Sequence, residues 1–207
     1  FRAAARDELV PYGVEFRHIG VKDARPERGG FRVALADGGK ESSRFLLLAT
    51  GVRDVLPKVP GVAECYGRSV FHCPYCDGWE WRDKHLAVFG RAAVPLALSL
   101  KTWSPHVVLC THGRQPDSAA RQRLAANGIV LRRSPVVRLA HVDGRITGIE
   151  FADGEAIPCD ALFFGTAQHP QDSLAERLGC AFNHKGTVNT GTLCDTNVPG
   201  VFVAGDA

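Results

Sequence analysis

Two cysteines separated by two residues, in the segment Cys73-Pro74-Tyr75-Cys76-Asp77-Gly78, are the residues best suited to covalent chemistry. At this spacing both sulfurs can lie at the start of a helix, where free amide hydrogens and the helix dipole stabilise a thiolate. The thiolate is the species that attacks a disulfide, and the nearby second cysteine resolves the mixed disulfide. Asp77 could carry a proton to or from the thiols, and Gly78 allows close approach of the backbone to a planar ligand. The pattern indicates a redox dithiol.

The same cysteine spacing also occurs in zinc sites and in purely structural pairs. A zinc site needs two further soft ligands. Cys65 and His72 lie close in the sequence, but no second Cys-x-x-Cys and no His-x-x-x-His is present. Both alternatives stay open beside the redox dithiol, and we expect no metal.

The other cysteines are isolated, and several of them lie in apolar runs. Each is expected to be a small buried hydrophobic residue. They are Cys65, Cys110, Cys159, Cys180 and Cys194. An odd number of cysteines spread over 207 residues does not match the disulfide framework of a small secreted domain. The pattern fits a reducing compartment, so we expect the protein in the cytoplasm.

The composition and the ends of the sequence give further information about the class of protein and its expected partners. The net charge is +3 and no basic run is interleaved with aromatic residues, so nucleic acid is not an expected partner. No apolar stretch approaches the ~20 residues that span a bilayer, so no membrane association is expected. The chain begins at Phe1 without Met, and no helix follows the last strand at Gly205-Asp206. We interpret it as an internal fragment of a longer protein.

Hydrophobic patterns and turn residues predict the elements that hold the dithiol. After the dithiol, strand, helix, strand and helix follow one another, which is typical of a parallel sheet. The linker-like segments 57–61 and 165–170 flank this region, as for an inserted domain. The expected strands are 14–19, 31–36, 45–50, 86–90, 107–111, 135–142, 145–151, 157–164 and 200–204, and the expected helices are 92–103, 117–127 and 172–179.

The order of four motifs resembles the low-molecular-weight thioredoxin reductases and, more broadly, the class II pyridine-nucleotide-disulfide oxidoreductases. These motifs are Ala49-Thr50-Gly51, the Cys-x-x-Cys-Asp-Gly segment, the strand ending in Gly90, and Gly-Val-Phe-Val-Ala-Gly205-Asp206. They cover most of the chain, from about 46 to 207. The resemblance implies an enzyme that passes electrons from NADPH through FAD to the Cys73–Cys76 disulfide and on to an external disulfide.

The resemblance also implies roles for single residues. Cys76 corresponds to the cysteine that faces the flavin, Cys73 to the one that attacks the substrate disulfide, and Asp77 to the proton donor. Among the cofactor-binding residues, Thr50 and Gly51 correspond to a turn near the flavin. Gly205 and Asp206 correspond to the pair that binds the flavin ribityl chain and approaches its phosphate.

The domain map follows from the same resemblance. We expect an α/β protein with two Rossmann-like, three-layer domains, one inserted in the other. Residues 1–58 and 168–207 would form a discontinuous, partial FAD-binding domain, and residues 62–164 an inserted NAD(P)-binding-like domain that carries the dithiol. The implied partner is a thioredoxin-like protein or a small-molecule disulfide or dithiol. The full-length protein is expected to be a homodimer.

The expected nicotinamide site departs from the family pattern. Relatives have Gly-x-Gly-x-x-Ala where this chain has Gly90-Arg91-Ala92-Ala93-Val94-Pro95, so Gly90 and Ala92 would face the pyrophosphate. After the next strand, only Arg114 or His112 could meet a 2′-phosphate. Two other functions therefore stay open: a flavin-dependent dithiol oxidase that uses oxygen, and a non-catalytic, degenerate nucleotide-binding module.

Overall fold

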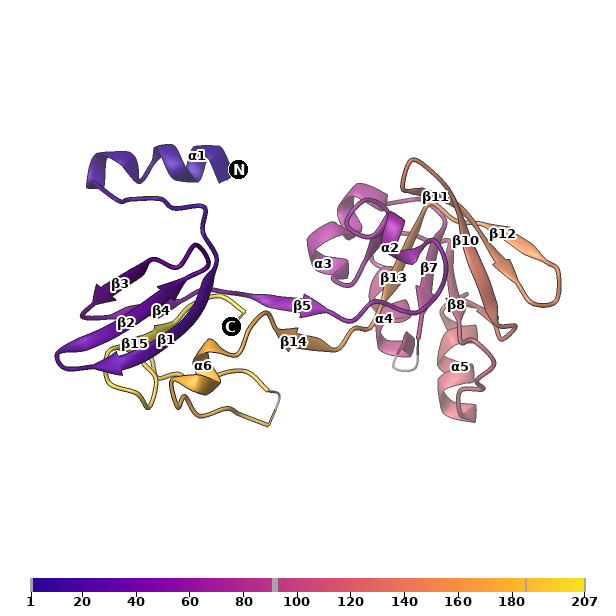
Figure 1. Ribbon diagram of the computed structural model, residues 1–207. Coiled ribbons are helices and arrows are strands. Elements are labelled where there is room, and N and C mark those ends of the chain that lie inside the picture. Colours follow the sequence, from indigo (N-terminus) through magenta and orange to yellow (C-terminus); the bar gives the residue numbers. More distant parts are fainter. Residues whose placement is uncertain (1, 91–92, 185, 207) are drawn as a thin grey trace. The chain divides into compact units, whose positions relative to one another are not determined.

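Residues 54–168 form one unit of the computed structural model, which describes residues 2–90, 93–184 and 186–206 (Figure 1). The residues up to 53 and those from 169 onward form the other unit. The chain therefore enters the continuous unit near Asp54 and leaves it near Gln168. Both points lie within a few residues of the Pro- and Gly-containing segments expected to be linkers.

A five-stranded parallel sheet is the centre of the continuous unit, with strand order β6-β13-β7-β8-β9. Its strands are β6 (Val70–Phe71), β7 (Leu86–Phe89), β8 (Val107–Cys110), β9 (Val130–Arg132) and β13 (Ala161–Phe164). Strands β7 and β13 are unbroken apolar runs, which is typical of strands covered on both faces. In the sheet, the side chains of Phe163 and Phe164 are fully buried.

Helices α4 (Ala93–Leu100) and α5 (Ser118–Ala126) link the parallel strands, as the alternating sequence pattern predicts. The carboxylate of Asp117 accepts a hydrogen bond of 2.7 Å from the amide of Ala120 and so caps α5. Pro95 lies in the first turn of α4, where a missing amide hydrogen costs little. In the part of the chain that the structure describes, no helix is long and apolar enough to cross a bilayer.

An antiparallel sheet of β10 (Val136–Val142), β11 (Arg145–Phe151) and β12 (Ala156–Pro158) shares a hydrophobic cluster with the parallel sheet and with helix α2 (Val62–Cys65). The single strand predicted for 157–164 was wrong. The segment divides between β12 and β13, which belong to different sheets. The break has a local cause, because Pro158 donates no hydrogen bond and the Asp160 carboxylate accepts one of 2.8 Å from the His85 amide.

The discontinuous unit contains an antiparallel sheet, the parallel pair β4–β15 and helix α6 (Leu174–Arg177). Its strands are β1 (Val21–Glu27), β2 (Gly30–Leu35), β3 (Lys40–Ser43), β4 (Leu46–Leu48) and β15 (Val201–Val203). The segments 45–50 and 200–204 were each expected to form a strand, and β4 pairs with β15 in register Leu47 to Phe202. Helix α1 (Arg2–Asp7) and the 3-10 turn η1 (Val10–Tyr12) precede this sheet.

The strand predicted for 14–19 was wrong. Val14 and Phe16 alternate with polar residues as in a half-buried strand, and Ile19 follows, but these three side chains are exposed and the first strand of the sheet begins at Val21. Alternation stabilises a strand only where one face meets a core. The guanidinium of Arg6 instead lies 5.3 Å from the centre of the Phe16 ring.

The two passages between the units run as paired strands, β5 (Val52–Asp54) and β14 (Gln168–Pro170). Just inside the continuous unit, the amide of Val55 donates to the carbonyl of Ala167 over 2.9 Å. The hydroxyl of Thr166 also bonds both the amide and the carbonyl of Val55. The entry and exit of the continuous unit therefore lie side by side.

Candidate functional site

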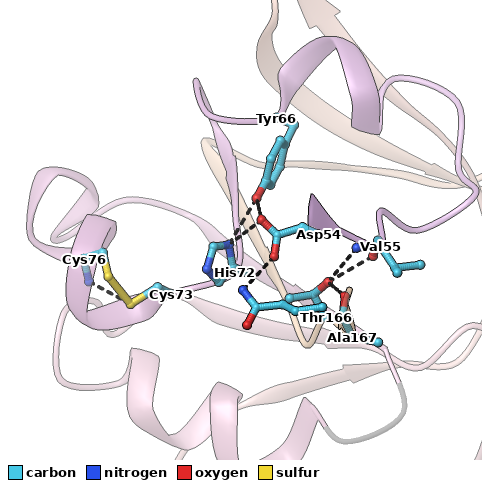
Figure 2. A network of polar contacts seen from close by, with 9 residues as sticks. Asp54, Val55, Tyr66, His72, Cys73, Cys76, Thr166 and Ala167 are labelled. Atoms are coloured by element: carbon cyan, nitrogen blue, oxygen red, sulfur yellow. Dashed lines mark hydrogen bonds and ion pairs between the residues drawn. A yellow bond between two sulfur atoms is a disulfide. The ribbon is translucent and has the colours of Figure 1, made fainter. Parts of the chain in front are cut away.

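Cys73 and Cys76 form a disulfide at the start of the short helix α3 (Pro74–Asp77), with their Cα atoms 5.3 Å apart (Figure 2). Cys73 is the N-cap residue, and its sulfur accepts a hydrogen bond of 3.2 Å from the amide of Cys76. Pro74 occupies the first helical position, where its fixed φ suits the helix. An amide aimed at the Cys73 sulfur would stabilise its thiolate after reduction. The geometry fits a redox pair.

Asp77 is the last residue of α3 and is half-buried. Burial and the negative charge of Glu80 raise the pKa of its carboxyl, and the nearby His72 partly offsets this effect. A carboxyl with a raised pKa gives up and takes back a proton closer to neutral pH. Asp77 is thus suited to exchange protons with the neighbouring thiols, as the sequence suggests.

Gly78 begins the 3-10 turn η2 (Gly78–Trp81) and packs against the indole of Trp103. A Cβ atom at Gly78 would lie 2.5 Å from Cδ1 of Trp103 and 2.6 Å from its Nε1. The sequence suggested that this glycine lets the backbone approach a planar ligand. In the structure the planar group is a side chain of the same unit.

His72, Tyr66 and Asp54 form a polar network next to the dithiol, which sequence reasoning missed (Figure 2). The Tyr66 hydroxyl donates a short hydrogen bond to Oδ2 of Asp54 and lies 3.2 Å from Nδ1 of His72. The same imidazole nitrogen is 3.6 Å from Oδ2 of Asp54. The side-chain amide of Gln168 donates to the other carboxylate oxygen over 3.0 Å. Every oxygen of the Asp54 carboxylate therefore has a partner.

These contacts fix the charge state of the network. Burial raises the pKa of Asp54, but the hydrogen bonds from Tyr66 and Gln168 and the charge of His72 outweigh it, so the pKa is lowered. Burial and the Asp54 carboxylate raise the pKa of the Tyr66 hydroxyl. At neutral pH the network holds an ionised Asp54 and a protonated Tyr66.

The buried cysteines contrast with the dithiol. Burial raises the pKa of Cys65, and it raises that of Cys110 to about 12. Cys159 is shifted in the same direction, again chiefly by burial. Thiols that stay protonated at neutral pH are poor nucleophiles. Cys65, the zinc ligand considered from the sequence, is fully buried in the hydrophobic cluster.

A cavity of about 420 Å³ lies beyond the carboxyl ends of β7 and β8. This is where open parallel sheets bind nucleotides. Gly90 lines it with φ of +121°, a conformation that favours glycine. Arg114 also lines it, and so does Arg123 on α5, which the sequence did not single out. Two guanidinium groups around one cavity suit an anionic nucleotide such as NADPH.

His112 and Ala92 were also expected at the nicotinamide site. His112 is not on this cavity: its Nδ1 accepts a hydrogen bond of 3.1 Å from the Val136 amide, and its ring packs edge-on against Phe89. Arg114 is therefore the better of the two phosphate candidates. Ala92 lies outside the described residues.

A second cavity, of about 510 Å³, lies in the discontinuous unit and is lined by Gly205 and Asp206. Its wall also contains Asn189, Thr190 and Cys194, so it is rich in polar atoms. Thr50 and Gly51 are not part of this wall. They follow β4, however, and β4 and β15 are parallel, so both pairs leave the same edge of the sheet. Polar groups at this edge fit the ribityl and phosphate groups of FAD.

A redox dithiol on a Rossmann-like unit defines a disulfide oxidoreductase of the nucleotide-dependent class. Comparison with known proteins agrees. The chain belongs to the pyridine nucleotide-disulphide oxidoreductase family, whose model matches residues 8–207. FAD and NADPH are the cofactors of its thioredoxin-reductase-like members. The α/β fold class and the oxidoreductase class predicted from the sequence are thereby confirmed.

Individual relatives give the same picture. The chain is 29% identical to the thioredoxin reductase tcpT of Claviceps purpurea, over its whole length and 69% of that protein. It is similar to the crystal structure of HlmI, with 36% identity, a TM-score of 0.91, and 99% of this chain and 66% of that one covered. An oxidoreductase from Agrobacterium tumefaciens is 31% identical, with a TM-score of 0.89 and coverages of 99% and 70%. The chain spans 60 to 69% of the first curated relatives.

Proposed function

We propose that the protein is an FAD-dependent dithiol/disulfide oxidoreductase of the thioredoxin-reductase type. Electrons would pass from NADPH by way of FAD to the Cys73–Cys76 disulfide and then to an external disulfide. The observation that carries this proposal is the disulfide at the start of α3, in the same unit as a nucleotide-sized cavity with Arg114 on its wall. FAD, when bound at the edge that carries Gly205 and Asp206, supplies the two electrons that reduce the disulfide.

The chain's own residues account for the exchange with the external disulfide. The thiolate of Cys73 attacks one sulfur of the substrate, the substrate S–S bond breaks, and the first thiolate leaves and takes a proton. Cys76 then loses its proton, attacks the Cys73 sulfur and releases the second substrate thiol. Two electrons and two protons move from the dithiol to the substrate, and the Cys73–Cys76 disulfide forms again. Asp77, with its raised pKa, carries the proton of Cys76.

The external partner is a disulfide, either of a thioredoxin-like protein or of a small molecule. The exposure of Tyr75, between the two cysteines, leaves room for either. Five of the seven cysteines are free thiols, which supports a reducing compartment and hence the cytoplasm. We expect a homodimer when the protein is full length.

Anaerobic spectra of the full-length, FAD-loaded protein test the proposal. NADPH should bleach the flavin, and an added disulfide should restore its colour. Bleaching by a small dithiol alone, with peroxide formed on admission of air, would instead support a dithiol oxidase. The replacement of the expected Gly-x-Gly-x-x-Ala pattern by the segment from Gly90 to Pro95 favours that alternative. Protein that binds no flavin would contradict both.

A further inference from the structure

The hydrogen bonds around Tyr66 determine where the proton of the His72 ring lies. A tyrosine hydroxyl has one proton to donate, and Tyr66 gives it to Oδ2 of Asp54, which is ionised and can only accept. The Tyr66 oxygen, 3.2 Å from Nδ1 of His72, must therefore be the acceptor in that contact. It follows that Nδ1 is the ring nitrogen that carries the proton.

The opposite ring nitrogen is consequently the basic one. With a proton on Nδ1, neutral His72 has its lone pair on Nε2. Figure 2 shows Nδ1 facing Tyr66 and Asp54, and the rest of the ring extending toward the side on which Cys73 lies. His72 directly precedes Cys73 in the chain, so the base and the attacking sulfur are held by adjacent residues.

We propose that Asp54 and Tyr66 are positioning residues that fix the tautomer of His72, so that its Nε2 accepts the thiol proton of Cys73. This inference rests on the proposed dithiol function. The proton of Cys73 passes to Nε2, and the resulting thiolate attacks the external disulfide. The substrate S–S bond breaks, and the leaving thiolate takes the proton back from Nε2. His72 ends the step neutral, with its Nδ1 proton unchanged throughout.

The position of Asp54 is itself held from a second side. Gln168, at the start of β14, donates to Oδ1 of Asp54, which leaves Oδ2 to face Tyr66. The ring of Tyr66 packs 6.0 Å from that of Phe164, so the hydroxyl is presented from the edge of the hydrophobic cluster. The positions of the Asp54 carboxylate and the Tyr66 hydroxyl therefore depend on the residues at the end of β5 and the start of β14.

This arrangement predicts an unusual result for Asp54→Asn. Because Gln168 donates to Oδ1, the amide nitrogen of the new side chain has to occupy the place of Oδ2. It would donate to the Tyr66 oxygen, and Tyr66 would then donate its proton to Nδ1 of His72. The ring proton would move to Nε2, and the base beside Cys73 would be lost. Tyr66→Phe removes the link but keeps the ring that packs against Phe164.

Nitrogen NMR of the reduced, FAD-loaded protein labelled with ¹⁵N-histidine tests the tautomer, and His72→Gln assigns the signals. We expect protonated Nδ1 and unprotonated Nε2 in the wild type, the reverse in Asp54→Asn, and a mixture in Tyr66→Phe. Reduction of a model disulfide should slow about 100-fold in His72→Gln, roughly tenfold or more in Asp54→Asn, and less in Tyr66→Phe. A wild-type proton on Nε2, or a tautomer indifferent to both substitutions, would overturn the proposal.

Two controls separate this inference from the proposed function. Asp37→Asn and Tyr12→Phe make the same chemical changes at exposed positions of the other unit and should change neither the His72 signals nor turnover. If the wild type reduces disulfides through Cys73 but the tautomer is not as stated, only the positioning role fails. If Cys73→Ser retains turnover, the proposed function itself fails.

Discussion

The dithiol and the cavity lined by Gly90, Arg114 and Arg123, here called the nucleotide cavity, lie in the same unit. They differ in how many residues each would need for its role. At the dithiol, one bond between the two sulfurs is made and broken, and neither cysteine can be replaced in that step. At the cavity, Arg114, Arg123 and the glycine turn at Gly90 all line the wall, so any proposed nucleotide binding would be shared among several groups. A covalent site should therefore fail completely when one atom changes, whereas a distributed binding site should weaken in steps.

The largest effect is expected at the dithiol. Cys73→Ser should lower reduction of an external disulfide by at least about 10³-fold, because a hydroxyl cannot form the mixed disulfide. FAD should stay bound in the full-length protein, which its absorption spectrum reports. Cys76→Ser should interrupt electron flow from flavin to dithiol, measured as loss of flavin reoxidation by disulfide.

Cys180→Ala is the matched control for these two variants, since it removes a buried thiol of the other unit. Its turnover should equal that of the wild type. Full disulfide turnover in either dithiol variant would show that the redox assignment is wrong.

A smaller effect is expected at the cavity. Arg114→Ala should weaken NADPH binding about 10- to 100-fold, the equivalent of one charge-assisted hydrogen bond of roughly 1.5–3 kcal/mol. NADH binding should change much less, because it lacks the 2′-phosphate. Titration calorimetry with both cofactors measures the difference, and Arg145→Ala, an exposed position on β11, is the control. If Arg114→Ala binds NADPH as tightly as the wild type, the 2′-phosphate site lies elsewhere, and Arg123 is the next candidate.

A substitution that disturbs the packing beside the dithiol should have an effect similar to or smaller than that of Arg114→Ala. Gly78→Ala places a methyl group 2.5 Å from Trp103, so either the indole or α3 must shift. We expect a loss of about 1–3 kcal/mol in the free energy of unfolding, measured by denaturant titration. Gly165→Ala is the control, because no atom lies within 4 Å of its Cβ position and its φ is not positive. Equal stability of the two variants would mean that Trp103 does not confine Gly78.

The smallest effect is electrostatic and has opposite signs on the two sides of His72. The pKa of Asp77 is raised, so the folded protein keeps that proton to higher pH and loses stability as pH rises above the ordinary carboxyl range. The pKa of Asp54 is lowered, so its contribution is present at neutral pH and is lost as pH falls. Asp77→Asn should therefore stabilise the protein slightly at pH 7, by about 0.5 kcal/mol or less.

Thermal melts between acid and neutral pH measure both carboxylates. Asp54→Asn should lower the melting temperature at pH 7 and converge with the wild type in acid. The same sign of change for both variants at pH 7 would contradict the assignment.

The sequence predicts this molecule best where a pattern is local. The spacing of Cys73 and Cys76 and the apolar runs of β7 and β13 depend on neighbouring residues alone, and the structure contains both features. The strand expected at 14–19 failed because alternation does not show whether a partner strand is present. The run 157–164 was divided because apolar content does not reveal a change of sheet.

The polar network was out of reach for a related reason. Asp54, Tyr66 and His72 are separated by 12 and 6 residues, and no helical or strand period joins them. They meet because β5, α2 and β6 converge in the folded unit. Similarly, Gly78 was explained from the sequence by a ligand, because its neighbour Trp103 comes from beyond α4. Local motifs identify the reactive atoms, whereas the residues that contact and position those atoms are brought together only by the tertiary structure.

The side-by-side passage of β5 and β14 has an evolutionary consequence. An inserted domain whose two ends are neighbours can be placed within a single surface turn of a host protein, because neither the host nor the inserted domain has to change its structure to join them. Val55 and Ala167, 112 residues apart in sequence order, are joined by one hydrogen bond of 2.9 Å. Residues 54–168 thus have the form of a transferable cassette, and a dithiol carried within it would arrive in a new host together with its nucleotide cavity.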